Sequence, residues 1–503
     1  MSTEFAPISL AGPATDAGAK RALILPGGGL RLSYQVGILQ ALQEAGLSFQ
    51  IMDGTSGGGL NLSMLLSGLS PADMAQRWRS LKLQDTLAFL PLKDYLTSSP
   101  PAALADTSGF KNKVLPHLGI DFERIHAAPV QASYNLLDYG DKAIEVVQHT
   151  AIDADLLIAG MSLPGVFAPL HRNGKVYLDT GFVQDANLTE AVRQGAEELW
   201  VLWGLGNTGV YLGDPLHLYV QMLEMSANSA LNQQLAAIRD LNVRIARGDS
   251  PHGQRRPVAV HIIKPDHPLP LDPDLYLGHI DHGTLIDMGY ADAKKYLAQQ
   301  QTAPAGASEI DLANPTRMVD PVPGIRLRLQ FCGVLTRQDG GGAQPATLQL
   351  CLHVHDLAQY IAAAQRRAPF TGHLQTAAWA SGPVPLHGGQ YVQTVLPDGA
   401  RRMTYQSALQ NGSKTLTLCA EQLLRNDAGL DLWKDLSTLS LRLLDGQTLW
   451  ASGDLTLSLP DLKSWLASLH ATETRSAAEA AATVARYGRF FLGELHSVYG
   501  WLG

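Results

Sequence analysis

The sequence predicts an α/β domain with a mostly parallel sheet, followed by a β-rich α+β domain. Three observations favour this fold class. Short apolar runs alternate with helical stretches up to about residue 300, which is typical of βα units. A segment rich in Pro, Ala, Gly and Gln then interrupts the pattern. Beyond it, apolar and polar residues alternate, as they do in antiparallel strands with one buried face.

Composition limits the class of protein. The 503 residues are too many for one ordinary core and predict two or three domains. The formal net charge of −8, without a block of like charge, argues against a nucleic-acid partner. Three cysteines are too few for a disulfide framework and indicate a reducing compartment. Because neither a secretory signal nor a membrane-spanning apolar stretch is recognisable, we expect a cytoplasmic protein whose membrane contact, if any, is peripheral.

The first domain is predicted to cover residues 21–300, after a flexible N-terminus at 1–20. Gly-rich turns are expected to open helices at 32–45 and 58–69. Apolar runs predict strands at 22–25, 49–52, 129–135, 175–178, 198–203 and 258–263.

A linker is predicted at 301–324, and a β-rich accessory domain at 325–503. Alternating residues predict strands at 325–331, 347–353, 414–418 and 438–443, and an amphipathic helix follows at 476–499. Residues 350–362 and 455–467 also resemble each other, which predicts two related strand-then-helix lobes.

The strongest chemical signal is the motif Gly54-Thr-Ser56-Gly-Gly58, between a predicted strand and a predicted helix. This context is typical of a nucleophile elbow, in which glycines allow a sharp turn and the serine Oγ lies near the positive end of the helix. Ser56 is therefore a candidate nucleophile for attack on an acyl carbonyl.

A second Gly-rich turn follows the first strand. The backbone N–H groups of Gly27, Gly28 and Gly29 can converge there, as an oxyanion hole requires, and Arg31 can hold the loop or meet an anionic head group. A nucleotide-phosphate loop is the alternative. It is disfavoured because Leu32 replaces the last glycine of a dinucleotide motif and no Gly-Lys-Ser/Thr follows.

A serine nucleophile needs a base, and Asp179, in a turn after a predicted strand, is the first candidate. A Ser-His-Asp triad remains open, with His261, His279 or His282 placed late enough in the chain. The pairs 266–267 and 281–282 are interpreted as polar loop residues, so neither a metal nor a cofactor is predicted.

In their order along the chain, these motifs resemble the patatin-like phospholipases over about residues 21–297. The stretches 162–167 and 287–292 also fit that family's pattern. The resemblance implies a three-layer α/β/α fold and a Ser–Asp dyad without a catalytic histidine. Ser56 would be the nucleophile, Asp179 the base, and Gly27, Gly28 and Gly29 the oxyanion loop, with Arg31 beside it. The sequence departs from the family's pattern at Leu32 and Thr180.

The resemblance thus predicts a lipid acyl hydrolase of the phospholipase A or esterase type, with lipid esters as substrates. A Ser-His-Asp esterase and a catalytically inactive lipid-binding protein are the alternatives. Residues 370–500 more weakly resemble a β-rich region of some bacterial cholesterol-oxidase-like proteins, through the motifs at 370–373, 431–435 and 486–491. No flavin site accompanies them, so an accessory role in lipid handling or location is expected. The sequence predicts no oligomeric state.

Overall fold

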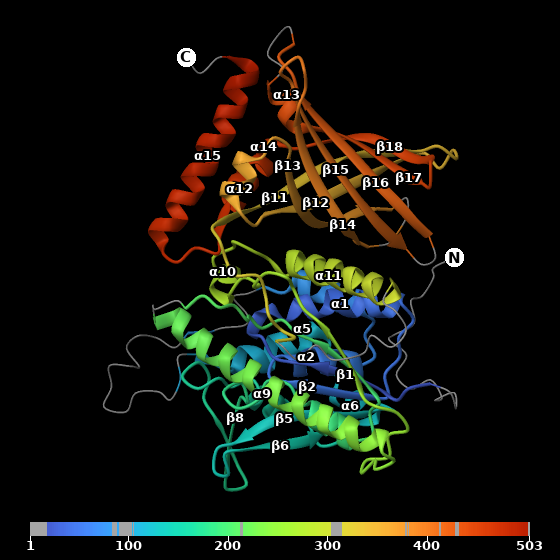
Figure 1. The fold of residues 1–503 in the computed structure, drawn as a ribbon, viewed down its shortest axis with the longest axis vertical. Coiled ribbons are helices and arrows are strands. Elements are labelled where there is room, and N and C mark those ends of the chain that lie inside the picture. Colours follow the sequence, from blue (N-terminus) through green and yellow to red (C-terminus); the bar gives the residue numbers. More distant parts are fainter. Residues whose placement is uncertain are drawn as a thin grey trace. The chain divides into compact units, whose positions relative to one another are not determined.

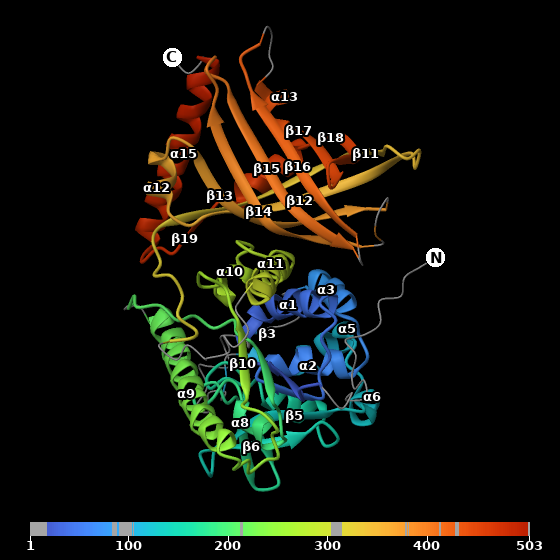
Figure 2. The same ribbon diagram turned by 45° about the vertical axis from the view of Figure 1, so that its right-hand side comes forward.

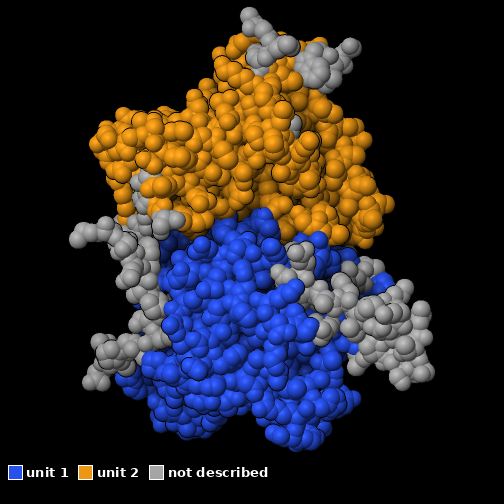
Figure 3. Space-filling model, turned by 180° about the vertical axis from the view of Figure 1, so that it is seen from behind, with its two compact units in different colours: residues 1–276, 281–319 blue, residues 277–280, 320–503 orange. Residues whose placement is uncertain are grey.

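The computed structural model of the chain divides into two compact units, shown in different colours in Figure 3. The first unit contains residues 1–276 and 281–319, and the second contains residues 277–280 and 320–503. The structure describes residues 18–82, 88–89, 103, 105–211, 215–302, 314–377, 380, 382–411, 414–427 and 432–500. Most of the predicted flexible N-terminus, residues 1–17, therefore lies outside the described part.

The first unit is built on an eight-stranded sheet with the strand order β10-β9-β1-β2-β5-β8-β7, and β6 pairs with β5. The pairs from β10 to β5 are parallel, whereas β6, β7 and β8 are joined by antiparallel pairs. The predicted mostly parallel sheet is confirmed. The strands of this unit are β1 (Arg21–Leu25), β2 (Ile51–Thr55), β3 (Ala88–Phe89), β4 (Ala105–Asp106), β5 (Gln131–Asp138), β6 (Ala143–Gln148), β7 (Leu170–Arg172), β8 (Lys175–Leu178), β9 (Glu198–Leu202) and β10 (Ala259–Ile263).

Helices cover both faces of this sheet, which completes the predicted three layers (Figure 2). Helices α1, α3 and α11 contact one another, and apolar residues of α8 and α9 share a core cluster with Ala22 and Ile24 of β1. The helical elements are η1 (Gly29–Leu32), α1 (Ser33–Glu44), α2 (Gly58–Leu66), α3 (Pro71–Ser80), η3 (Phe110–Val114), α5 (Leu115–Leu118), α6 (Phe122–Ala127), α7 (Ala154–Ala159), α8 (Leu188–Arg193), α9 (Pro215–Ala246), α10 (Asp272–Tyr276) and α11 (His282–Thr302).

The predicted linker at 301–324 is only partly described. Thr316 is fully buried, and Met318 belongs to the core cluster beneath α8 and α9. The Thr316 hydroxyl also donates to Asn228 of α9 at 2.5 Å. This part of the segment is therefore attached to the first unit, and the chain passes into the second unit at Asp320.

The second unit contains a closed antiparallel barrel of the eight strands β11 to β18. The ring closes because the long strand β11 pairs with both β12 and β18, and β19 pairs with the start of β11. This confirms the predicted β-rich domain. Its strands are β11 (Gly324–Arg337), β12 (Ala343–Val354), β13 (Arg366–Thr376), β14 (Val384–Val395), β15 (Arg401–Asn411), β16 (Lys414–Leu424), β17 (Thr438–Asp445), β18 (Thr448–Thr456) and β19 (His470–Thr472).

Within the described residues of the second unit, four helices accompany the barrel, and α15 is the longest of them (Figure 1). Ser476 caps α15 by accepting a hydrogen bond from the Glu479 N–H, which fixes the start of the predicted amphipathic helix. No helix among the described residues is both long and apolar enough to cross a membrane. The helices are α12 (Leu357–Ala362), α13 (Leu432–Ser437), α14 (Leu459–Ser468) and α15 (Ala477–Tyr499).

The two similar segments of this unit have the same local structure. In the first, β12 leads into α12, which Asp356 caps; in the second, β18 leads into α14, which Ser458 caps. Strands β12 and β18 pair with opposite edges of β11. The predicted repeat of a strand followed by a helix is therefore present, but both copies belong to one closed barrel and do not form two separate lobes.

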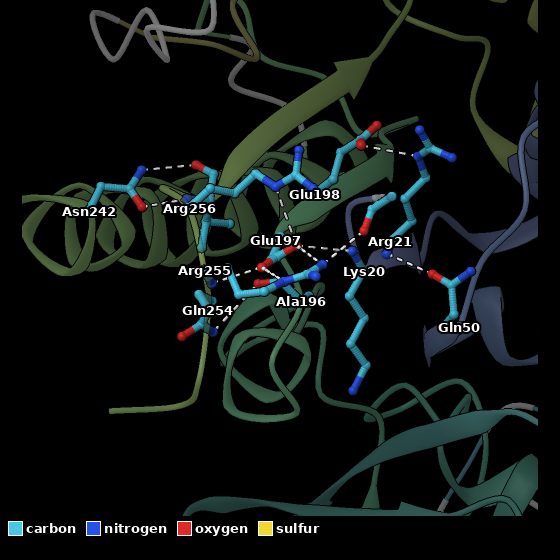
Figure 4. Close-up of polar contacts among 12 residues, drawn as sticks. Lys20, Arg21, Gln50, Ala196, Glu197, Glu198, Asn242, Gln254, Arg255 and Arg256 are labelled. Atoms are coloured by element: carbon cyan, nitrogen blue, oxygen red, sulfur yellow. Dashed lines mark hydrogen bonds and ion pairs between the residues drawn. The ribbon is translucent and has the colours of Figure 1, made fainter. Parts of the chain in front are cut away.

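A buried carboxylate connects the starts of the parallel strands in the first unit (Figure 4). Glu197 precedes β9 and is 3% exposed. It accepts hydrogen bonds from the backbone N–H of Lys20 and from the backbone and guanidinium of Arg255, and Arg256 lies 3.4 Å away. Burial acts to raise the pKa of Glu197, but the hydrogen bonds and charge of Arg255 outweigh it, so the pKa lies below its ordinary value.

We expect Glu197→Gln to lower the free energy of unfolding by about 2 kcal/mol at neutral pH, because it removes charge-assisted hydrogen bonds from a buried group. A carboxyl whose folded-state pKa is lowered stabilises the protein above its ordinary pKa, and this contribution disappears as the pH falls through the lowered value. Urea unfolding at neutral and acidic pH measures the difference. The exposed Glu123→Gln is the control, and an equal effect of the two substitutions would contradict the interpretation.

Candidate active site

Ser56 lies in the sharp turn between β2 and α2. Its φ is +50°, a left-handed conformation that costs a residue with a Cβ about 1 kcal/mol or more. The glycines on either side allow the close packing that holds this turn. A Cβ on Gly58 would lie 2.0 Å from the carbonyl oxygen of Leu25, and one on Gly54 would lie 3.0 Å from the Leu62 side chain. The turn thus holds a strained serine two residues from each of two tightly packed glycines, of which Gly58 leaves no room for a side chain.

Asp179 lies beside Ser56, although the two residues are far apart in the sequence. The Ser56 Oγ donates to Asp179 Oδ2 at 2.6 Å, and the Gly181 N–H donates to Oδ1 at 2.8 Å. Asp179 is 1% exposed, and this burial raises its pKa to about 6 against the opposing effect of the two hydrogen bonds. The carboxylate is therefore more basic than an exposed aspartate and is in contact with the hydroxyl.

A network of buried polar side chains joins the end of β2, immediately before Ser56, to the neighbouring strand β5. Asp53 of β2 accepts hydrogen bonds at 2.7 Å from Ser133 and Asn135 of β5, and Asn135 also donates to Thr55 and accepts from Asn187. Burial raises the pKa of Asp53 to about 7. These contacts join β2 to β5 immediately before the serine, so they fix the strand end from which Ser56 projects.

The Gly-rich loop between β1 and α1 adopts a conformation that depends on glycine. Gly28 has φ +147° and Gly29 has φ +61°. Arg31 is 8% exposed, and its Nε donates to the carbonyl oxygen of Gly28 at 3.0 Å. Its guanidinium also lies 3.6 Å from Glu224 of α9. Arg31 is thus buried and hydrogen-bonded to the Gly-rich loop. Holding this loop is one of the two roles that the sequence suggested for Arg31.

The N–H groups of this loop differ in their partners. Leu30 donates to the carboxylate of Asp272 at 3.0 and 3.1 Å, and Gly27 donates to the carbonyl oxygen of Asp185 at 3.3 Å. Within the described part of the chain, the N–H groups of Gly28 and Gly29 have no acceptor. Both remain available to a developing oxyanion.

Asp185 is a site residue that the sequence did not predict. A Cβ on Gly27 would lie 2.4 Å from Asp185 Oδ1 and 2.8 Å from the Ser56 Cβ, so the loop, the second carboxyl and the serine are packed together. Burial and the charge of Asp179 raise the pKa of Asp185 well above its ordinary value, against the effects of Arg31 and Gly27. Two carboxyl groups with different environments therefore lie in one site.

Asp272 of α10 was also missed. Burial raises its pKa, while the charge of Arg31 and the Leu30 N–H oppose the change. Asp272 lies more than two hundred residues after the Gly-rich loop from whose Leu30 N–H it accepts a hydrogen bond, so no local sequence pattern could connect it with that loop. The sequence held one weak hint of Asp185, because this residue follows Asp179 by six positions in the segment between β8 and α8.

The two departures from the family pattern differ in how well they fit their surroundings. Leu32 is buried against the elbow, since a Cβ on Gly57 would lie 2.2 Å from Leu32 Cδ1. The larger residue at position 32 therefore fits because position 57 has no side chain. Thr180 is fully buried, and its hydroxyl has no hydrogen-bond partner among the described residues.

The histidines of the alternative triad have other partners. His261 stacks on Trp200, and its Nδ1 lies 3.0 Å from the Tyr296 hydroxyl. The Nδ1 of His282 lies 3.0 Å from the Ser33 hydroxyl, and burial lowers the pKa of His282 to about 4. His279 belongs to the short segment 277–280 that groups with the second unit. The structure brings Asp179 to Ser56 and gives His261 and His282 structural neighbours instead.

Comparison with known proteins adds one family match. No curated protein sequence matches the chain. Among solved structures, the chain is similar to the crystal structure of VipD from Legionella pneumophila, with 13% sequence identity and a TM-score of 0.32, over 59% of this chain and 70% of that one. The family model described as patatin-like phospholipase matches residues 23–192, about a third of the chain, and includes Ser56 and Asp179. The resemblance of residues 370–500 to cholesterol-oxidase-like proteins stays a prediction. Residues 23–192 thus match the patatin-like phospholipase family model, and they lie within the patatin-like α/β domain of the first unit.

Proposed function

We propose that the first unit is a lipid acyl hydrolase that uses Ser56 as nucleophile and Asp179 as base. The observation that carries this proposal is the 2.6 Å hydrogen bond between the two side chains, made by a serine in a strained elbow. The patatin-like domain at residues 23–192 supports lipid esters as the substrate class. A phospholipase A or simple esterase activity fits this site.

The reaction follows from the geometry of the site. As the Ser56 Oγ attacks the acyl carbonyl, its proton passes to Asp179, and negative charge develops on the carbonyl oxygen. The N–H groups of Gly28 and Gly29 are the donors that we assign to this oxygen. The alcohol leaves with the proton from Asp179, and water then attacks the acyl-enzyme by the same route, which releases the fatty acid and restores Ser56.

Apolar side chains lie near the turn that follows Asp179, and we assign the acyl chain to this side of the site. The side chains of Leu163 and Leu223 approach Gly181, next to Asp179, and Phe182 packs edge to face against Tyr219. An apolar wall beside a few polar groups is the usual composition of a small-molecule site. Since lipid esters are held in membranes, we also propose a peripheral membrane contact during turnover.

Labelling with a fluorophosphonate tests whether the serine is activated. We expect the wild-type chain to be labelled at Ser56, because an activated hydroxyl attacks the phosphorus and an ordinary serine does not. Peptide mass spectrometry identifies the modified residue. An unlabelled, folded protein would favour the alternative of an inactive lipid-binding protein.

The raised pKa of Asp179 predicts the pH dependence of the reaction. Only the ionised carboxylate can accept the serine proton, so kcat/KM should fall about tenfold per pH unit below about pH 6 and level off above it. The rate on a soluble nitrophenyl ester between pH 4.5 and 8 gives the profile, with circular dichroism as the check on folding. A rate that stays constant across this range in a folded protein would contradict Asp179 as the base.

A further inference from the structure

Helix α9 presents an exposed face without charge over most of its length. From Pro215 to Ile238 the sequence contains Glu224 as its one acidic residue, and it contains no lysine or arginine. Figures 1 and 2 show α9 on the outside of the first unit, where a helix normally carries charged residues. Exposed residues three or four positions apart share one side of the helix. They form what we call the uncharged face: Met222, Met225, Ser229, Asn232 and Ala236.

The one acidic residue of this stretch is directed away from the uncharged face, towards the Gly-rich loop. Glu224 accepts a hydrogen bond from the Gly206 N–H at 3.1 Å and lies 3.6 Å from the guanidinium of Arg31. Further along the same helix, the exposed positions become charged, beginning with Arg239 and Asp240. The uncharged face is therefore confined to the part of α9 that contacts the candidate active site.

The segment that follows Asp179 joins this part of α9 to the site. Phe182 packs edge to face against Tyr219, and its carbonyl oxygen accepts a hydrogen bond of 2.7 Å from the Ser226 hydroxyl. The next residue, Val183, is 39% exposed. On the uncharged face itself, the two methionines are 53% and 69% exposed. Exposed apolar side chains therefore border the side of the site to which we assign the acyl chain.

We propose that the uncharged face of α9, together with Val183, rests on an electrically neutral lipid surface and so brings the lipid ester to Ser56. Methionine side chains adapt their shape to irregular apolar surroundings, and a face without ions loses no ionic hydration when it enters the head-group region. Anionic lipids would call for lysine or arginine, which this stretch of α9 lacks.

The composition of the face also favours lipid over a protein partner. Protein interfaces depend mainly on tryptophan, tyrosine and arginine, and the uncharged face contains none of them. The inference rests on the proposed function, because it names the surface through which the hydrolase would meet its substrate.

Flotation of the full-length Ser56→Ala protein with phosphatidylcholine vesicles measures docking without turnover. We expect binding that changes little as the salt concentration is raised. Met222→Asp combined with Met225→Asp should weaken this binding at least about tenfold, because two unpaired carboxylates would have to enter the head-group region. Val243, in the charged part of the same helix, is 47% exposed, and Val243→Asp is the matched control that should leave binding unchanged.

Three results would overturn the proposal. Undiminished binding of the folded methionine variant would place the lipid contact elsewhere in the chain. An equal loss in Val243→Asp would mean that any added charge on α9 acts in the same way. Binding to vesicles only when they contain phosphatidylserine, or to no vesicle at all, would make a protein the better partner for this face. Because the Ser56→Ala protein performs no hydrolysis, these results leave the hydrolase proposal intact.

Activity measurements distinguish the two proposals from the other side. With Ser56 in place, the ratio of the rate on phosphatidylcholine vesicles to the rate on a soluble nitrophenyl ester should fall at least about tenfold in the methionine variant. An unchanged ratio would overturn the docking proposal. If the wild-type chain hydrolyses neither substrate but its vesicle binding depends on the two methionines, docking stands and the hydrolase proposal fails.

A substitution of opposite effect locates the contact on α9. Met225→Trp should tighten vesicle binding severalfold, because the indole ring favours the membrane–water interface. The added tryptophan emission should also shift to shorter wavelength when phosphatidylcholine vesicles are present, whereas Val243→Trp should show no such shift. Misfolding does not produce a gain of affinity. Weaker binding or an unshifted spectrum in a folded Met225→Trp protein would overturn the proposal.

Discussion

Replacing Ser56 with alanine is expected to reduce ester hydrolysis by about a millionfold, as loss of the nucleophile does in other serine hydrolases. Alanine removes only the Oγ that donates to Asp179 at 2.6 Å. The backbone of the elbow is held by Gly54 and Gly58, so the fold should survive. Turnover of a nitrophenyl ester and a thermal unfolding curve measure the two effects.

The exposed Ser80→Ala is the control for this experiment, and it should keep full activity. Comparable turnover by a folded Ser56→Ala protein would mean that another group attacks the ester. The assignment of the elbow to catalysis would then be wrong, whatever the family of the domain.

The second large effect concerns the base. Asp179→Asn should lower kcat by about a thousandfold or more, because an amide keeps the shape of the carboxylate but cannot accept the serine proton. The hydrogen bond from the Gly181 N–H can persist, so the turn should stay in place. Steady-state kinetics on a soluble ester separate this loss from any change in KM.

Asp185→Asn is the matched control, since Asp185 is a second buried carboxyl in the same site. Its pKa is raised well above the ordinary value, so the neutral amide replaces a group that is itself inclined to be neutral. We expect kcat within about tenfold of wild type. A large loss in His261→Ala or His282→Ala together with an active Asp179→Asn protein would instead favour the triad.

Much of the first unit was predictable because its Gly-rich turns and the candidate nucleophile are marked by residues that lie next to one another in the sequence. The glycines around Ser56 and the Gly27–Gly29 turn directly follow apolar runs, and such a pattern marks the end of a strand and the start of a helix. Strand β8 was expected as well, but its antiparallel pairing with β5 depends on distant partners. Asp185 and Asp272 were missed for the same reason, because only the folded chain brings their carboxyls to the Gly-rich loop.

In the second unit, strands β13, β14 and β15 were not predicted. Pro369 and Gly372 interrupt the alternation of β13, and its pairing with β14 shifts register near Gly388 and Gly389. Strand β17 contains neither proline nor glycine and was predicted almost to its bounds. Local pattern therefore located the regular strands, whereas closure of the barrel came from the pairing of β11 with β18.

The pairing of β11 with β18 has a consequence for synthesis on the ribosome. Cys332 and Thr456 are partners in the ladder, so the first strand of the barrel must wait until more than a hundred further residues have been translated before its second edge is covered. The described elements of the first unit all precede β11, and that unit can fold while the barrel is still emerging. The nascent edge of β11 is meanwhile a surface that chaperones would recognise, and α15 can cover the apolar interior only after the ring has closed.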